Sequence, residues 1–312
     1  MRIRFWGVRG SVPTPLTPSR LRSKISSIMQ RVEPADLESQ EARERFLASL
    51  PPYLFSCVGG NTSCVEVEIR DDLRIVFDAG TGIRELGLAL AARKRPVDCR
   101  VFFSHFHWDH LQGLPFFAPA FDPSSRITYH SPIKGFRELV EAQMRSPWFP
   151  VTMDVMRAPR EWMELSERPV AVGDATLSHR TMNHPGGCYS YMVERGGKKV
   201  IYSTDTELQR GDFLRNEANA AYFEDAEALI IDAQYTLDEA LEKTDWGHSS
   251  FSLAADFASE WGIRRLVLFH HEPSYDDRKI ETIFKSAEWY VERLATRGLE
   301  VILAREGLEI EV

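Results

Sequence analysis

Hydrophobic and β-branched residues recur along this chain in short runs separated by turn signals, a pattern typical of β-strands. Ten runs are predicted as strands: Arg2–Trp6, Ser63–Ile69, Leu73–Phe77, Arg100–Ser104, Arg126–Tyr129, Ala175–Arg180, Tyr189–Glu194, Lys199–Ser203, Ala228–Asp232 and Arg265–Phe269. So many short strands imply two sheets.

Apolar residues at helical spacing predict helices between these strands. The four clearest helical patterns are Gly82–Ala92, Lys134–Arg145, Phe251–Trp261 and Asp277–Arg297. Ser249 and Ser250 are expected to cap the third helix, because serine oxygens accept hydrogen bonds from the first free backbone amides. The mixture of strands and helices predicts an α/β (α+β) fold of packed sheets covered by helices.

The segment from Pro15 to Tyr53 breaks this rhythm. Leu21, Ile25 and Met29 fall at helical spacing, and a second, charge-rich helical stretch follows Pro34. We interpret residues 15–53 as a helical insertion in a single domain that spans residues 1–312. Covering a sheet edge, acting as a lid and contacting a second subunit are the roles left open for it.

The 312 residues include 43% hydrophobic ones, enough for a substantial core. The net charge of −8 argues against long nucleic acid as the main partner, because proteins that track phosphates carry basic surfaces. The chain shows no signal peptide or membrane span, so a cytoplasmic location is expected. The scattered cysteines form no C-x-x-C pair and are interpreted as reduced, buried thiols: Cys57, Cys64, Cys99 and Cys188.

The strongest chemical signal is Ser-His-Phe-His-Trp-Asp-His at 104–110, directly after a predicted strand. Alternate residues of an extended segment share a face, so His105 and His107 can bind one metal ion. The turn that follows would bring Asp109 and His110 toward another ion. Imidazole and carboxylate ligands together suit Zn²⁺, while Mn²⁺, Fe²⁺ and cobalt are alternatives that the spacing leaves open.

An H-x-H-x-D-H pattern after a strand resembles the metallo-β-lactamase superfamily. The resemblance implies a four-layer αββα sandwich, in which helices flank two mixed sheets that hold two divalent metal ions. It also implies that Asp78, in Phe-Asp-Ala-Gly-Thr-Gly, braces the ligand loop without binding metal.

Three later motifs extend this resemblance along the chain. His184 in Asn-His-Pro-Gly-Gly matches a metal-binding motif, and Asp205 in Tyr-Ser-Thr-Asp-Thr matches the carboxylate that bridges two ions. Leu-Phe-His-His-Glu-Pro offers His270 or His271, and the family pattern favours His270. The implied first site is His105, His107 and His184; the implied second site is Asp109, His110 and His270, with Asp205 shared.

His248 lies in Gly-His-Ser-Ser before a predicted helix, which resembles the catalytic-histidine motif of tRNA 3′-processing endoribonucleases and related phosphodiesterases. The resemblance implies that His248 donates a proton to the leaving oxygen. His130 and His179 have no motif support, and we interpret both as structural histidines.

The residues around 5–15 and 59–64 resemble the opening motifs of smaller bacterial phosphodiesterases in this superfamily. This resemblance places Ser11, Asn61 and Thr62 beside the metal centre. Another segment, Ser-Pro-Trp-Phe-Pro-Val at 146–151, is interpreted either as a loop that stacks on a base or as one that packs against the insertion.

Together these features predict a dinuclear metal-dependent phosphodiesterase in which a metal-bridging hydroxide, Asp109 and His248 perform catalysis. A small phosphodiester, such as a cyclic nucleotide or a cyclic ribose phosphate, is the expected substrate, since the chain lacks the Gly- and Lys-rich arm of RNA-gripping relatives. The first alternative is a metal-dependent acyl hydrolase (lactonase, thioesterase or β-lactamase-like). The second, a diiron redox protein, fits less well because those relatives carry glutamate in place of His107. A homodimer is a family-level expectation.

Overall fold

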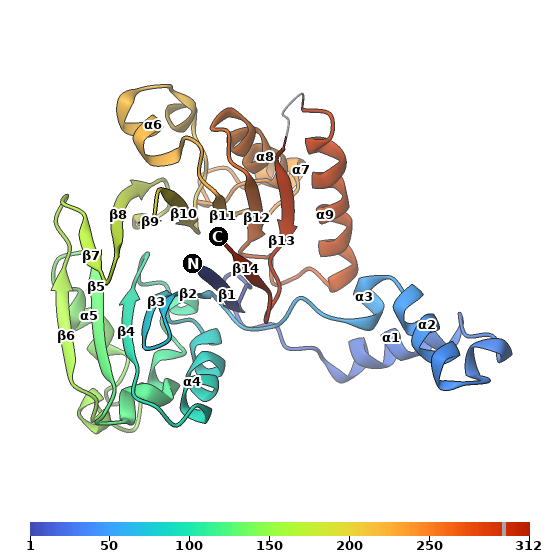
Figure 1. Cartoon of the computed structure of the whole chain (residues 1–312), viewed down its shortest axis with the longest axis horizontal. Coiled ribbons are helices and arrows are strands. Elements are labelled where there is room, and N and C mark those ends of the chain that lie inside the picture. Colours follow the sequence, from blue (N-terminus) through green and yellow to red (C-terminus); the bar gives the residue numbers. More distant parts are fainter. Residues whose placement is uncertain (295–297) are drawn as a thin grey trace.

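The computed structural model describes residues 1–294 and 298–312, whose strands form two seven-stranded sheets (Figure 1). The first sheet has the order β14 (Glu309–Glu311), β1 (Arg2–Gly7), β2 (Cys64–Arg70), β3 (Leu73–Phe77), β4 (Asp98–Phe102), β5 (Arg126–Ser131) and β6 (Arg160–Glu164). Strands β14, β1, β2 and β3 pair antiparallel, and β3 to β6 pair parallel, so the sheet is mixed.

The second sheet has the order β13 (Glu300–Leu303), β12 (Arg265–Phe269), β11 (Ala228–Asp232), β10 (Lys198–Ser203), β9 (Cys188–Arg195), β8 (Ala175–Met182) and β7 (Val170–Val172). Strands β10 to β13 pair parallel, and β7 to β10 pair antiparallel. This sheet is therefore mixed as well.

Alternation along the strands divides their side chains between an inner and an outer face. In β3, Ile75 and Phe77 join the core between the sheets, whereas Val76 packs with Ile83 and Leu86 of α4 (Gly82–Ala92). The outer face of the first sheet also contacts α5 (Phe136–Ala142), and that of the second contacts α6 (Glu217–Phe223), α8 (Phe251–Glu260) and α9 (Asp277–Val291). The predicted αββα sandwich is confirmed.

Short helices complete the connections between the layers. They are α7 (Leu237–Glu242), η2 (Trp108–His110), η3 (Leu114–Phe116), η4 (Ala118–Phe121), η5 (Met153–Val155) and η6 (Arg210–Phe213). Within residues 1–294 and 298–312, no helix combines the length and apolar character needed to cross a membrane.

Every predicted strand is present, with ends that differ by at most two residues. The four strands that the sequence did not predict are β6, β7, β13 and β14, which are the edge strands of the two sheets. An edge strand is covered less than a central one, so its apolar signal is weaker. The β6 sequence Arg-Glu-Trp-Met-Glu, for example, is mostly exposed.

The predicted helices are present with adjusted ends. Helix α4 has the predicted bounds, the helix expected from Lys134 is shorter, and α9 ends at Val291; the last predicted residues, 295–297, lie outside the described residues. Ser250 caps α8, because its Oγ accepts a hydrogen bond from the Leu253 amide. The Ser249 hydroxyl donates to the Thr206 carbonyl oxygen instead, so the expected cap at Ser249 is wrong.

Residues 18–55 form α1 (Pro18–Met29), η1 (Pro34–Leu37), α2 (Gln40–Ser49) and α3 (Pro52–Phe55). These helices extend away from the two sheets in Figure 1, where α3 lies near α9. No residue of α1 is buried, and its apolar residues Leu21, Ile25 and Met29 are 47%, 53% and 65% exposed. The apolar stripe of α1 therefore does not cover a sheet edge.

Candidate metal centre

The candidate ligands follow strands that end at one edge of the sandwich. In the first sheet, Asp78 follows β3 and the segment 104–110 follows β4. In the second sheet, Asp205 follows β10 and His270 follows β12 directly. Since the carboxyl ends of parallel strands lie at one edge of a sheet, the two sheets bring these residues together from distant parts of the sequence.

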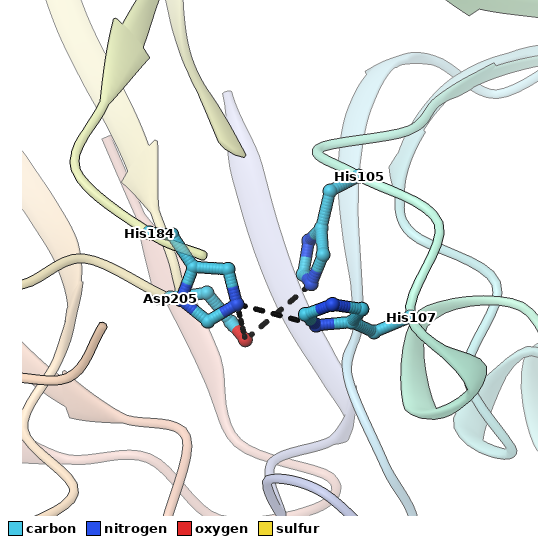
Figure 2. Close-up of side chains that lie close together, drawn as sticks. All are labelled: His105, His107, His184 and Asp205. Atoms are coloured by element: carbon cyan, nitrogen blue, oxygen red, sulfur yellow. Dashed lines mark hydrogen bonds and ion pairs between the residues drawn. The ribbon is translucent and has the colours of Figure 1, made fainter. Parts of the chain in front are cut away.

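The first group of donors comprises His105, His107, His184 and Asp205, whose ligand atoms lie within 4.8 Å of one another. Figure 2 shows the four side chains pointing toward a common centre, His105 and His107 from one side and His184 and Asp205 from the other. Oδ2 of Asp205 lies 3.6 Å from Nε2 of His105 and 3.8 Å from Nε2 of His184.

The second group comprises Asp109, His110, Asp205 and His270. Oδ1 of Asp205 lies 3.2 Å from Nε2 of His110 and 3.1 Å from Nε2 of His270. Oδ2 of Asp109 lies 3.1 Å and 3.3 Å from the same two nitrogens. The two oxygens of Asp205 thus face different groups, as a carboxylate shared by two cations would.

Asp78 supports the ligand loop and is not itself a member of either donor group. Its Oδ1 accepts a hydrogen bond from the Ser104 amide, and its Oδ2 accepts bonds from the Ser104 and Tyr202 hydroxyls. Nδ1 of His110 also lies 2.8 Å from Oδ2. A hydrogen bond at Nδ1 orients the His110 ring so that Nε2 faces the second group.

Other histidines of the two groups are oriented in the same way. Nδ1 of His184 lies 3.0 Å from the Gly247 carbonyl oxygen, and Nδ1 of His270 lies 3.0 Å from Oε1 of Gln234. His271, the alternative to His270, lies outside both groups because its Nε2 donates to the Ala304 carbonyl oxygen at 2.9 Å. The structure therefore places His270 at the centre.

Several residues of the site adopt a backbone conformation that side chains disfavour. Ser11, Asp78, Asp205 and His270 have φ angles of 60°, 59°, 47° and 60°. Each such residue costs on the order of 1–3 kcal/mol and persists only where its surroundings hold it in place. The hydrogen bonds around the site hold these residues in place. The backbone conformation lowers the stability of the fold, and in return the side chains are fixed in position.

Burial and neighbouring charges set the protonation of these donors. Burial lowers the pKa of His105 well below its usual range, which keeps the ring neutral. Burial would raise the pKa of Asp205, but the charges of His270, His110 and His105 hold it well below its usual range. Burial would lower the pKa of His270, but Asp205 together with Asp109 and Asp232 raises it to about 10.

Both groups have the donor chemistry of a metal site. Nε2 of His105 and Nε2 of His110 are buried and make no well-aligned hydrogen bond among the described residues, although carboxylate oxygens lie 3.1–3.6 Å away. A buried polar atom without a partner is unfavourable unless something else binds it. Imidazole nitrogens and carboxylates in groups of four match the ligand sets of Zn²⁺ and related divalent ions, so the residues fit the predicted pair of metal ions.

His248 lies beside this centre and has a carboxylate partner that the sequence did not reveal. Its Nδ1 is 2.6 Å from Oδ2 of Asp232, the last residue of β11. Asp232 is fully buried; burial would raise its pKa, but His248 and His270 lower it. A carboxylate directly after the apolar run Ala-Leu-Ile-Ile was the available sequence signal for this partner.

An open cleft of about 480 Å³ leads to the two groups. Its lining includes His107, Asp109, His184, Asp205 and His248, together with Ser11, whose amide donates to Oδ2 of Asp109 at 2.7 Å. The expected position of Ser11 beside the centre therefore agrees with the structure.

Asn61 and Thr62 do not line the cleft. The amide and side chain of Asn61 donate to the Glu306 carboxylate, and Thr62 exchanges hydrogen bonds with Thr81 through Oγ1 and its backbone amide. Both residues fasten the 59–64 turn to its neighbours, so the structure gives them a structural position where the sequence suggested a place at the site.

The aromatic segment 146–151 also lies outside the lining of the cleft. Phe149 is half-buried against the core beneath the first sheet and contacts the Phe116 ring at 6.0 Å, while Trp148 is 75% exposed. Neither interpretation offered for this segment describes these contacts, because Phe149 packs on the sandwich itself.

Comparisons with known proteins agree with the αββα fold. Residues 73–271, more than half of the chain, match the family model described as the beta-lactamase superfamily domain. Ribonuclease Z of Lactiplantibacillus plantarum is 22% identical over 278 residues, which cover 73% of this chain and 87% of that protein.

Two solved structures resemble the whole chain. The metallo-beta-lactamase fold protein YhfI of Bacillus subtilis has a TM-score of 0.64 at 16% identity and covers 100% of this chain and 98% of its own. Zinc-bound PqqB of Methylobacterium extorquens has a TM-score of 0.64 at 16% identity and covers 100% of both chains. At this identity the likeness concerns the fold.

Proposed function

Because this chain belongs to the beta-lactamase superfamily, we propose that it is a dinuclear metal-dependent hydrolase that cleaves a phosphodiester bond in a small substrate. The resemblance to the branch containing the tRNA 3′-processing endoribonucleases is confirmed by the similarity to ribonuclease Z. The observation that carries the proposal is the position of Asp205, whose two oxygens face two separate groups of histidines.

The metal ions would be held by the two groups of donors. His105, His107 and His184 would hold one ion, Asp109, His110 and His270 would hold the other, and Asp205 would contact both. Two such ions supply an acidified water and offset negative charge on the phosphoryl oxygens. Zn²⁺ is the proposed metal because both groups combine imidazole with carboxylate ligands; Mn²⁺ and Fe²⁺ are the competitors that metal analysis would reveal.

His248 is the proposed general acid. Its Nδ1 is occupied by Asp232, so Nε2 is the nitrogen left to face a substrate in the cleft. From there Nε2–H donates its proton to the oxygen that leaves phosphorus. General acid catalysis of this kind raises the reaction rate by roughly 10²–10⁴-fold. The buried Asp232 carboxylate accepts from Nδ1–H and fixes the orientation of the ring, which carries the transferable proton at Nε2 when both ring nitrogens are protonated.

A small phosphodiester, such as a cyclic nucleotide or a cyclic ribose phosphate, is the proposed substrate. The cleft of about 480 Å³ is within the range typical of small-molecule sites, and the net charge of −8 gives long RNA no overall attraction. The similarity to ribonuclease Z supports a competing substrate, an RNA end. A cytoplasmic location and a homodimer remain predictions.

The test combines metal analysis with a substrate panel. Wild type, Asp205→Ala and His248→Ala are compared. Metal content is measured by mass spectrometry, and hydrolysis is measured with bis-p-nitrophenyl phosphate, 2′,3′- and 3′,5′-cyclic nucleotides and a precursor tRNA. His179→Ala is the matched control, since His179 lies in neither donor group. We expect about two ions per wild-type chain, fewer in Asp205→Ala, and loss of cyclic-nucleotide turnover in both site variants.

Other outcomes separate the alternatives. Turnover of precursor tRNA without turnover of cyclic nucleotides would retain the phosphodiesterase and change its substrate. Hydrolysis of lactones or thioesters alone would favour the acyl hydrolase. Two redox-active iron ions without hydrolysis of any substrate would favour the diiron protein.

A further inference from the structure

Two tryptophans at the mouth of the cleft are unusually exposed for residues beside a polar site. The side chains of Trp108 and Trp246 are 85% and 61% exposed, and both line the cleft that contains Asp205 and His248. Exposed apolar side chains are common when scattered singly over a surface. Here two indoles share one concave site, which indicates a use for their faces.

Trp108 is part of the segment that carries the ligands. It lies between His107 and Asp109 and begins η2, and its carbonyl oxygen accepts hydrogen bonds from the Leu111 and Gln112 amides. The same backbone turn that positions Asp109 therefore positions this indole. The backbone from which the indole projects is therefore held in place by these hydrogen bonds.

Trp246 is positioned at the cleft through its neighbour Gly247. The Gly247 amide donates to Oε2 of Glu207 at 2.9 Å, and its carbonyl oxygen is 3.0 Å from Nδ1 of His184. Nζ of Lys243 lies 5.7 Å from the centre of the Trp246 ring. A cation near the ring adds an attraction for a negatively charged ligand on this side.

Neither indole has an aromatic partner in the part of the chain that the structure describes. The only ring contact recorded there for Trp108 or Trp246 is the cation of Lys243. Apart from Lys243 over the Trp246 ring, the described residues place no ring or cation on either indole, so indole faces remain open to a ligand. Flat aromatic groups are the ligands that gain most from an indole face, and stacking a base on an aromatic side chain is worth roughly 1–3 kcal/mol.

The chemistry of the cleft points to one such ligand. The histidines and carboxylates at its floor suit a phosphodiester group, while its mouth is aromatic and has Lys243 nearby. A group that joins an anionic phosphorus centre to a flat ring is a nucleotide. An acyl chain would gain apolar contact from the indoles but nothing from their planar faces or from the cation.

We propose that Trp108 and Trp246 form a nucleobase subsite, on which the base of the substrate stacks while its phosphodiester group lies at the histidine and aspartate groups. This inference rests on the proposed function, because the base belongs to the phosphodiester that is cleaved. Every base has a π-face on which an indole can stack, so the subsite accepts all four bases and favours the larger purines.

The test uses two substrates with the same reacting group. The p-nitrophenyl ester of thymidine 5′-monophosphate and methyl p-nitrophenyl phosphate share their phosphorus and leaving group, and only the first has a base. The measured quantity is the ratio of the two kcat/KM values for wild type, Trp108→Ala, Trp246→Ala and the corresponding Phe variants. Trp148→Ala is the matched control, because Trp148 is 75% exposed and lies outside the cleft.

We expect each alanine variant to lower the ratio about tenfold, each phenylalanine variant to restore most of it, and the control to leave it unchanged. Metal content is measured in parallel, since Trp108 adjoins two proposed ligands. An unchanged ratio in both alanine variants, or equal losses on both esters, would overturn the subsite.

A binding measurement separates this inference from the proposed function. Quenching of tryptophan fluorescence by AMP and by ribose 5-phosphate is titrated on the metal-loaded protein. If wild type hydrolyses neither ester, the proposed function fails. Tighter binding of AMP than of ribose 5-phosphate, lost in both alanine variants, would still support the subsite. Equal affinity for the two ligands in wild type would contradict it.

Discussion

Nδ1 of His248 lies 2.6 Å from Oδ2 of Asp232, a carboxylate that is itself completely buried. Two further hydrogen bonds hold this carboxylate, since its Oδ1 accepts from the amides of Gln234 and Ser249. The ring of His248 is therefore attached to the central strands of the second sheet through one rigid side chain.

Replacing Asp232 with asparagine should impair the proton donation by His248 selectively. We expect Asp232→Asn to slow hydrolysis of a cyclic nucleotide, whose ribose oxygen leaves poorly, by about 10²-fold. Hydrolysis of bis-p-nitrophenyl phosphate should change much less, because its leaving group needs no proton. Steady-state kinetics on both substrates decide the matter, with exposed Asp174→Asn as the control. Equal losses on the two substrates would indicate that Asp232 only supports the fold.

Removing the metal ions should destabilise the protein. A ligand that binds only the folded state adds about 2.7 kcal/mol per site at a free concentration one hundred times its Kd. Chelation should therefore lower Tm, and added Zn²⁺ should restore it in wild type more than in Asp205→Ala. Calorimetry with increasing Zn²⁺ measures both effects. A Tm that does not change with the Zn²⁺ concentration would argue against a metal centre.

Metal affinity should also rise with pH. In the metal-free protein, Asp205 and its neighbours outweigh burial and raise the pKa of His270 to about 10, so this ring carries a proton at neutral pH. Metal binding must displace that proton, which costs more as pH falls. Competition titrations with a chromophoric chelator at pH 6 and pH 8 should show tighter Zn²⁺ binding at pH 8, after correction for the chelator's own titration.

Gly247 should not tolerate a side chain. A Cβ atom at this position would lie 2.2 Å from Nδ1 of His184, and its φ of +86° already disfavours other residues. Gly307→Ala is the matched control, because Gly307 has a φ of +81° and nothing within 4 Å of its would-be Cβ. Both variants should lose about 1–2 kcal/mol of stability from the backbone conformation.

Only Gly247→Ala should in addition displace His184 and reduce metal content and activity. Urea unfolding, metal analysis and kinetics compare the two variants. Normal metal content and activity in Gly247→Ala would mean that His184 does not hold an ion in this position.

The buried His130 should make the protein sensitive to acid. Its ring stacks on Phe102 at 4.2 Å, its nitrogens have no hydrogen-bond partner among the described residues, and burial lowers its pKa to about 3. Below the unfolded pKa of about 6.5, the unfolded chain takes up a proton that the folded chain does not. The free energy of unfolding therefore falls by roughly 1.4 kcal/mol per pH unit between about pH 6 and pH 3.

His130→Phe keeps the aromatic stack and removes this titration. Between pH 7.5 and pH 4.5, metal-free His130→Phe should lose about 2–3 kcal/mol less than metal-free wild type in urea unfolding. His179→Phe is a control at a half-buried histidine, where the difference should be smaller. Equal losses in wild type and His130→Phe would show that His130 is protonated in the folded protein.

The sequence predicted the central strands and the donors that follow them, because both signals are local. A strand rich in Val, Ile and Phe can be identified from about five consecutive residues, and a ligand cluster such as 104–110 can be identified in the same way. Edge strands β6 and β14 gave weak patterns because one side of each is open to water.

The hydrogen-bond partners of the donors could not be predicted in this way. Asp232 contacts His248 only because β11 ends beside the turn before α8. Asn61 donates a hydrogen bond to Glu306, which lies 245 positions away in the sequence. Such pairs depend on which strands become neighbours in space. Local patterns contain no information about that choice, and a resemblance of short motifs misplaced Asn61 for the same reason.

Helix α1 has no buried residue, although it is twelve residues long and capped by Thr17. A helix of this length is marginal in water, and the support that the structure shows for it comes from α3 and from the polar contacts of Lys24 with Ser56 and Asp277. Its backbone amides should therefore exchange with deuterium through frequent local opening, far faster than those of β4 or β11 at the centre of the sheets. A protease should make its first cut in this part of the chain and leave the two sheets, with all of the proposed ligands, folded.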